Sequence, residues 1–243
     1  MEEQIIYGRN PVEESLKEGL DRLYIQKGQK EGSIRKIISQ ARQAGIPIFE
    51  RDKARLDDLA QGGKHQGVVA IRTSFKYVTI EDILAYAQER KEAPLILFLD
   101  GIEDPQNLGA IARSALALGA HGLVIPKHRA ARVNGRVFKA SAGAIDHLRV
   151  AMVTNMSQEV LALKDRGLWF YGAHMEGDSL YETRLEGPMG LVIGSEGQGI
   201  SKKLRDHMDF LISIPMAGAF DSLNASVAAG ILLYERARQG HGS

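Results

Sequence analysis

Five apolar runs in the second half of the chain decide the fold: LILFLD (95–100), GLVIP (122–126), LWFYGA (168–173), MGLVIG (189–194) and FLISIPM (210–216). Their hydrophobicity is continuous rather than alternating, which predicts strands covered by helices on both faces. Glycine-rich turns and helical patterns follow them, so we expect an α/β domain with a mostly parallel sheet. Open sheets of this kind bind ligands beyond the carboxyl ends of their strands. The segments after Asp100, Pro126, Gly194 and Met216 are therefore the candidate site.

The N-terminal part of the chain predicts a second, smaller α/β domain, at residues 1–74. Short helical patterns alternate there with β-branched runs. Asn10 is expected to cap the first helix, with Pro11 at its first position. Further elements are expected as strands at 22–26, 46–50 and 68–73 and helices at 33–44 and from residue 52. A polar stretch with one exposed helix at 80–91 predicts a linker, 75–93, before a main domain at 94–243.

The composition excludes several classes of protein. The chain of 243 residues has 31 Lys and Arg against 30 Asp and Glu, so it is not a polycation that coats nucleic acid indiscriminately. The absence of cysteine excludes disulfides, thiolate nucleophiles and iron–sulfur clusters. The histidines are scattered and imply no metal. The N-terminus lacks a signal-peptide pattern and no apolar run reaches roughly 18 residues, so we expect a cytoplasmic protein.

Basic residues are concentrated in one segment, 127–149, which holds six Lys and Arg and one Asp. A phosphate backbone is a natural partner for such a segment, because each neutralised phosphate releases counterions. A solvated loop and helix face is the equally weighted alternative.

The first candidate turn, DGIEDPQN (100–107), leads into a helix expected at 108–118. Asn107 is well placed as its N-cap. Arg113 lies off the apolar seam and is expected to face outward, either as an ordinary surface arginine or as a guanidinium that binds a phosphate or an oxyanion. The seam itself is expected to comprise Leu108, Ile111, Ala112, Ala115 and Leu116.

The second turn, GSEGQGIS (194–201), carries three glycines and one acid, Glu196. Glycines at a strand end let the backbone approach a flat ligand. The order of residues matches neither a dinucleotide fingerprint, nor a P-loop, nor the nucleophile elbow of serine hydrolases. Glu196 is either a helix N-terminal acid or a ligand-side residue.

The third turn, IPMAGAFDSLNAS (214–226), leads into a final helix expected to end near Arg238. Ser222 and Asn224 are expected to cap this helix or to hold a ligand at its start. A core stripe on the helix is expected at Leu223, Val227, Ile231 and Tyr234.

Three segments carry a family resemblance: LDGIEDPQNLGAIARSALALGAHGLVIP, LVIGSEGQGIS and ISIPMAGAFDSLNASVAAGILLYE. They resemble, in this order, the three motifs of the SpoU-type (SPOUT superfamily) RNA ribose 2′-O-methyltransferases. The N-terminal YGRNPVEESL and HQGVVA are similar to that family's substrate-binding domain, whose fold is like that of ribosomal protein L30e. The resemblance covers nearly the whole chain and is strongest to the bacterial enzymes that methylate a guanosine of 23S ribosomal RNA.

The resemblance implies a C-terminal domain threaded into a trefoil knot, S-adenosylmethionine as cofactor, RNA as substrate and a homodimer formed through the C-terminal domain. It implies catalytic roles for Arg113, Asn107, Glu196, Ser222 and Asn224. It places around the cofactor Gly194, Gly199, Ile214, Met216 and Leu223. RNA contacts are expected from Arg9, Lys127, Arg129, Arg132 and Arg136.

A ribose 2′-hydroxyl is a poor nucleophile, and Arg113 is expected to stabilise its developing negative charge. A guanidinium stays protonated, so any base role would be shared with a substrate phosphate. Three alternatives stay open: a transfer RNA methyltransferase of the same family, an RNA-binding ribosome-assembly factor without catalysis, and a small-molecule enzyme that uses a nucleotide cofactor.

Overall fold

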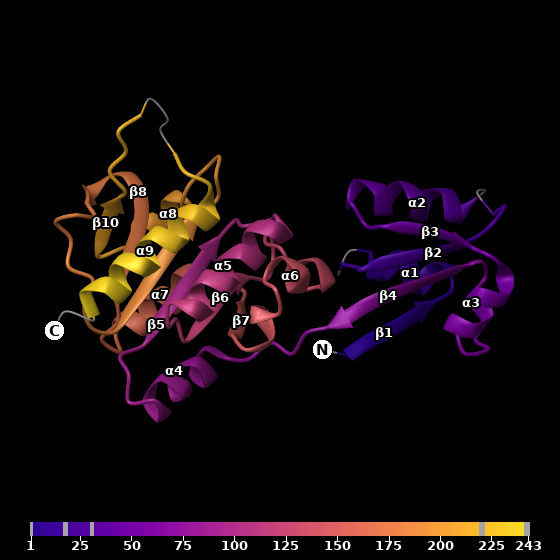
Figure 1. The fold of residues 1–243 in the computed structure, drawn as a ribbon, viewed down its shortest axis with the longest axis horizontal. Helices are drawn as coiled ribbons and strands as arrows, with labels where there is room; N and C mark the ends of the chain where they lie inside the picture. Colours follow the sequence, from indigo (N-terminus) through magenta and orange to yellow (C-terminus); the bar gives the residue numbers. More distant parts are fainter. Residues whose placement is uncertain (1, 17–18, 30–31, 219–221, 241–243) are drawn as a thin grey trace. The chain divides into compact units, whose positions relative to one another are not determined.

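The computed structural model describes residues 2–16, 19–29, 32–218 and 222–240. Contacts between Cα atoms divide the chain into two units (Figure 1). The first comprises Met1–Lys76 and Arg132–Arg136, and the second comprises Tyr77–Ala131 and Val137–Ser243.

The first unit is built on a four-stranded mixed sheet with the order β1-β4-β2-β3. β4 pairs antiparallel with β1 and β2, and β2 pairs parallel with β3. Apolar residues from the sheet and from α1 and α2, including Val12, Leu23, Ile37 and Val68, form its core. The elements are β1 (Glu2–Tyr7), α1 (Arg9–Ser15), β2 (Arg22–Gln26), α2 (Ser33–Gln43), β3 (Ile48–Arg51), α3 (Lys53–Leu59) and β4 (Val68–Ser74).

One expectation for this unit was wrong, and one strand was not predicted. The N-cap of α1 is Gly8, not Asn10, so Pro11 is the third residue of the helix. Proline is tolerated there because the N–H groups of a first turn have no partner within the helix. Sequence patterns also missed β1, a strand at the edge of the sheet whose Glu3 and Gln4 are exposed.

The second unit contains a six-stranded sheet with the order β10-β8-β9-β5-β6-β7, and all of its described pairings are parallel. This confirms the predicted α/β class. β7 was not predicted, since it is short and opens with Arg149. The strands are β5 (Leu95–Asp100), β6 (Gly122–Pro126), β7 (Arg149–Val153), β8 (Trp169–Ser179), β9 (Met189–Gly194) and β10 (Phe210–Ser213).

Helices cover both faces of this sheet (Figure 1). Ile96 and Phe98 of β5 belong to a buried cluster with residues of α4, α7 and α8. Successive strand residues point to opposite faces. The equally buried Leu97 and Leu99 therefore lie on the other face, where α5 and α9 pack. The helices are α4 (Ile80–Glu89), α5 (Pro105–Ala117), α6 (Gly135–Ala140), the 3₁₀ helix η1 (Ala144–Asp146), α7 (Met156–Lys164), α8 (Lys202–Arg205) and α9 (Ala225–Gly240).

The helix at 80–89 is amphipathic rather than simply exposed. Ile80, Ile83 and Ala87 of α4 are buried, and the first two belong to the cluster beneath the sheet. Thr79 and Asp82 form a capping box at its start, in which each side chain bonds the other residue's backbone N–H.

The core stripe predicted for the last helix was wrong. α9 buries Ala225, Ala229, Leu232 and Leu233. Val227 and Tyr234 are instead 48% and 61% exposed, and Leu223 and Ile231 are half-buried. On α5, four of the five predicted seam residues are fully buried, whereas Leu116 is 36% exposed. Leu116 of α5 and Val227 and Tyr234 of α9 thus present apolar side chains to solvent.

His121 is a core histidine at the start of the central sheet. The N–H of Leu95 donates to its Nδ1 at 3.0 Å, so Nε2 carries the proton and donates to Glu92 at 3.1 Å. Burial is the main cause that lowers the pKa of His121 below its ordinary value of 6.5. Within the described chain, no helix has the length and apolarity required to cross a bilayer.

Candidate active site

The carboxyl ends of β5 and β9 bring the first two candidate turns together. The two strands are neighbours in register, with Asp100 opposite Gly194. A Cβ atom placed on Gly101 would lie 3.5 Å from the Cβ of Ser195. The turns that follow both strands therefore meet at one edge of the sheet, as expected for parallel strands.

The glycine turn after β9 is closed and anchored. Ser195 and Gly199 exchange backbone hydrogen bonds of 3.2 and 2.8 Å, and the N–H of Ser201 donates to Asp100 Oδ2 at 2.8 Å. A Cβ on Gly194 would lie 2.0 Å from the carbonyl carbon of Gly199, so only glycine permits this fold of the turn. The closed turn fixes the backbone that carries Glu196.

Asn107 is not the N-cap that its sequence position suggests. Asp104 caps α5 by accepting from the N–H of Gln106 at 3.0 Å, and Pro105 is the first helical residue. The Asp-Pro pair is itself a signature of a helix start and could have identified this cap. Asn107 lies in the first turn of α5, and its Nδ2 donates to Glu196 Oε1 at 2.7 Å.

Asn224 caps the last helix, as predicted, and also bonds two residues of the other turns. Its Oδ1 accepts from the N–H groups of Ser226 and Val227, at 2.9 and 3.3 Å, and so caps α9. Its Nδ2 donates to Asn107 Oδ1 at 3.0 Å and also to Glu196 Oε1. Three residues from three separate segments thus form one hydrogen-bonded network, which we call the Asn-Glu-Asn cluster: Asn107, Glu196 and Asn224.

The structure does not bring Arg113 or Ser222 into this cluster. Arg113 is exposed on α5, six residues beyond Asn107 and so about 9 Å further along the helix axis. Ser222 is exposed beside Asn224. Neither side chain forms a hydrogen bond with another described residue of the chain. The outward orientation predicted for Arg113 is confirmed.

The predicted cofactor residues lie in the turns after β9 and β10 and before α9. Gly199 has a φ of 62°, Gly194, Ile214 and Leu223 are half-buried, and Met216 is 40% exposed. In the same turns, a Cβ on Gly197 or on Gly218 would meet no atom of the described residues within 4 Å. The backbone is therefore uncrowded at these two glycines. No group of three or more potential metal ligands occurs among the described residues.

The basic stretch at 127–149 is divided between the two units. Lys127 and Arg129 are exposed in the loop after β6, within the second unit. Arg132 and Arg136 are half-buried in the segment that groups with the first unit. Arg149 lies with its guanidinium carbon 3.4 Å from the centroid of the Tyr86 ring, so it forms an internal cation–π contact.

Comparisons with known proteins agree with this architecture. Residues 94–234 match the SpoU rRNA Methylase family, and residues 5–78 match the domain described as RNA 2′-O ribose methyltransferase substrate binding. YacO of Bacillus subtilis, whose name assigns it to the TrmH family of tRNA/rRNA methyltransferases, is 43% identical over 95% of this chain and 93% of its own length.

Two solved structures align with different shares of this chain. AviRb from Streptomyces viridochromogenes, a SpoU methyltransferase in complex with AdoMet, is 28% identical with a TM-score of 0.64, over 99% of this chain and 92% of its own. The A. aeolicus TrmH/SpoU tRNA modifying enzyme is 32% identical with a TM-score of 0.57, over 67% of this chain and 85% of its own. The chain therefore belongs to the SpoU (TrmH) family of RNA 2′-O-ribose methyltransferases.

Proposed function

We propose that the chain transfers a methyl group from S-adenosylmethionine to the ribose 2′-hydroxyl of a guanosine in 23S ribosomal RNA. The observation that carries this proposal is the Asn-Glu-Asn cluster, which lies where the ends of β5 and β9 meet the start of α9. Polar side chains gathered at that edge of a parallel sheet are the expected machinery of an active site.

The open glycine turns fit the cofactor. Backbone without side chains at Gly197 and Gly218 leaves room for a flat adenine, and the AdoMet complex of AviRb supports this assignment. When bound, the cofactor supplies a sulfonium methyl carbon that is open to in-line attack by the ribose oxygen. The residues that would hold it are Gly194, Gly199, Ile214, Met216 and Leu223.

The protein's own contribution is to orient the ribose and stabilise charge. Two amides fix Oε1 of Glu196, which leaves Oε2 to accept a hydrogen bond from the substrate. Arg113 stabilises the developing oxyanion on O2′, and the released proton passes to a substrate phosphate, because a guanidinium does not give up its own proton. Ser222, beside Asn224, orients the substrate together with Asn107.

The exposed faces of α5 and α9 support a homodimer. Arg113 and Leu116 lie on the outer face of α5, and Val227 and Tyr234 on that of α9. A second copy packed on these faces would bury the apolar side chains and exclude water from Arg113. The variant Val227→Glu/Tyr234→Glu is expected to be monomeric in sedimentation and to lose methyl transfer. A monomeric wild-type protein would contradict the dimer.

The description of the matched family favours ribosomal over transfer RNA, because residues 94–234 match the SpoU rRNA Methylase family. The A. aeolicus tRNA modifying enzyme aligns with 67% of the chain, whereas AviRb aligns with 99%. The present chain thus adds a substrate-binding domain, which we assign to residues 1–74, joined by 75–93 to a methyltransferase domain at 94–243. In this assignment Arg9, Lys127, Arg129, Arg132 and Arg136 contact RNA phosphates.

The test is to map 2′-O-methylation across total RNA from cells with and without the protein. One guanosine of 23S RNA is expected to depend on it. A dependent site in transfer RNA would refute the ribosomal assignment, and no dependent site would refute methyl transfer.

The catalytic role of Arg113 has a separate test. Arg113→Ala is expected to keep RNA and cofactor binding and to lose about 100-fold or more in kcat. Arg184→Ala, which removes another exposed arginine of the same unit, is the control. A wild-type kcat for Arg113→Ala would remove this residue from the mechanism.

A further inference from the structure

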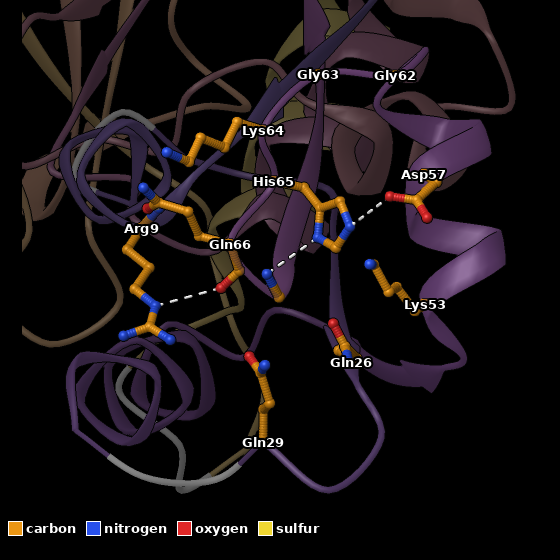
Figure 2. Close-up of a pocket in the computed structure, with 11 residues that line it drawn as sticks. Arg9, Gln26, Gln29, Lys53, Asp57, Gly62, Gly63, Lys64, His65 and Gln66 are labelled. Atoms are coloured by element: carbon orange, nitrogen blue, oxygen red, sulfur yellow. Dashed lines mark hydrogen bonds and ion pairs between the residues drawn. The ribbon is translucent and has the colours of Figure 1, made fainter.

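We propose that a polar hollow in the first unit binds one unpaired nucleotide of the RNA and helps to select the substrate. This inference rests on the proposed function. The hollow has a volume of about 720 Å³ and is lined by residues of α1, β2, α3 and the loop 61–67 (Figure 2). This volume lies in the ordinary range for small-molecule sites.

The wall formed by the loop 61–67 is rigid. His65 is buried, and its Nδ1 accepts from the N–H of Gly67 at 2.9 Å. Its Nε2 therefore carries the proton and donates to Asp57 Oδ1, also at 2.9 Å (Figure 2). These bonds fix the histidine tautomer and tie the loop to α3. A preformed wall lowers the entropic cost of binding a ligand.

Gln66 is held in an uncommon conformation at the edge of the hollow. Its φ is 53°, in the left-handed region that non-glycine residues rarely adopt. Arg9 secures it twice: the backbone N–H of Arg9 donates to Gln66 Oε1, and the Arg9 Nε–H donates to the Gln66 carbonyl, both at 3.2 Å. Backbone strain of this kind concentrates at binding sites.

Charge at the hollow favours an anion. Figure 2 shows Arg9 from α1 and Lys53 from α3 on either side of the segment 65–67, and Lys64 extends from the loop itself. Neither lysine forms an ion pair with another described residue. The one acid among the described lining residues is Asp57, and its carboxylate already accepts from His65. A phosphate would balance the excess of positive charge.

Three glutamine side chains supply groups that distinguish bases: Gln26, Gln29 and Gln66. A primary amide carries both a donor and acceptors, as the edges of nucleobases do. Oε1 of Gln29 is buried and has no hydrogen-bond partner among the described residues, and an unsatisfied buried acceptor is destabilising. A ligand donor would satisfy it once the amide turns toward the hollow.

An unpaired nucleotide combines these requirements. It presents a phosphate and a free base edge, whereas a base-paired nucleotide in an RNA helix hides its edge in a narrow groove. No Phe, Tyr or Trp is among the described lining residues, and the ring of His65 is buried, so recognition rests on hydrogen bonds and charge rather than on stacking.

The experiment measures binding and methylation by the full chain with the variant Lys53→Ala/Lys64→Ala. Its matched control is Lys36→Ala/Arg42→Ala, which removes two positive charges from α2, away from the hollow. The probe is a 23S RNA transcript that the wild-type protein methylates or, failing that, a single-stranded oligonucleotide of mixed sequence.

The hollow variant is expected to raise KM for RNA roughly tenfold and to leave kcat within about twofold of wild type. The slope of log affinity against log salt should fall by about 0.7, since the hollow neutralises one phosphate and each phosphate contact to a single strand contributes about 0.7. Gln29→Ala should change the preference among RNA sequences and leave the salt slope unchanged.

A wild-type KM and salt slope in the hollow variant, or an equal loss in the control, would overturn the inference. If the wild-type protein binds RNA but methylates none, the proposed function fails. In that case the salt slopes of the two double variants still test whether the hollow binds a phosphate of the RNA.

Discussion

Replacing Gly194 with alanine tests whether the closed glycine turn organises the active site. The new Cβ would lie 2.0 Å from the carbonyl carbon of Gly199, 2.2 Å from the nitrogen of Ile200 and 2.3 Å from the oxygen of Gly199. Carbon atoms in contact are normally about 3.5–4.0 Å apart. All three obstructing atoms belong to the backbone, so no side chain can rotate away.

The cost follows from this geometry. Overpacking costs about 1–3 kcal/mol, and displacement of the turn also breaks the hydrogen bonds between Ser195 and Gly199, at about 1 kcal/mol each. We expect a loss of about 3 kcal/mol or more, which lowers Tm by roughly 6–12 °C for a chain of this size. Glu196 moves with the turn, and a shift of about 1 Å reduces methyl transfer by roughly 100-fold.

The same turn contains two controls. The Cβ of Gly199→Ala meets no atom of the described residues within 4 Å, but the φ of 62° makes alanine cost about 1 kcal/mol. Gly197→Ala has open space and no positive φ, so Tm should stay within about 2 °C. The assays are thermal unfolding and transfer of labelled methyl groups to RNA. A wild-type Tm and rate for Gly194→Ala, or equal losses of stability in all three variants, would refute the reasoning.

Three further predictions concern single side chains. Asn224→Asp keeps the cap of α9 but replaces the amide donor to Glu196 with a second carboxylate. Methyl transfer should therefore fall about 100-fold, and denaturant unfolding should show a loss of stability near 1 kcal/mol. A variant with wild-type activity would show that the Asn-Glu-Asn cluster is not needed for methyl transfer. Burial lowers the pKa of His121 in the folded chain, so protonation of this histidine favours the unfolded chain and stability falls as pH drops below about 6.5. His121→Asn should flatten this pH dependence in urea titrations between pH 7 and 5. Parallel curves of stability against pH for the variant and the wild type would contradict it. Arg238 and Gln239 lower the pKa of Glu235 from 4.5 to about 2, so the contribution of its charge to stability is present above pH 4.5 and is lost as pH falls toward 2. Glu235→Gln should lower the free energy of unfolding by less than about 1 kcal/mol at pH 7. A difference in stability between the variant and the wild type that persists at pH 2 would exclude this cause.

The sequence predicted the parallel sheet because buried strands must be apolar on both faces, and five runs have this property. It missed the strands whose residues break the pattern, β1 with exposed polar residues and β7 with Arg149 at its start. The stripe on α9 was wrong for a different reason. The helix has two apolar faces, and the small residues Ala225 and Ala229 allow the other one to approach its neighbours closely. The hydrophobic pattern of a helix with two apolar faces does not show which of them is buried.

The residues of the Asn-Glu-Asn cluster were predicted from their motifs, but their bonds were not. Asn107 and Asn224 are separated by 117 residues, and their contact depends on the packing of α5 against α9. The sequence offered Asn107 as a cap because helix starts favour asparagine. Asp104 takes that role instead, which leaves the Asn107 amide to bond Glu196.

Because the Asn224 side chain both caps α9 and bonds Glu196, the Asn-Glu-Asn cluster can assemble only late in synthesis of the chain. The amide that holds Glu196 belongs to the residue that begins the last helix, so the network closes only after α9 has been made and docked. A nascent chain that ends before residue 224 contains every strand of the sheet but lacks one of the three members of the cluster. If the cluster is catalytic, as proposed, methylation by this protein starts only after α9 has been translated.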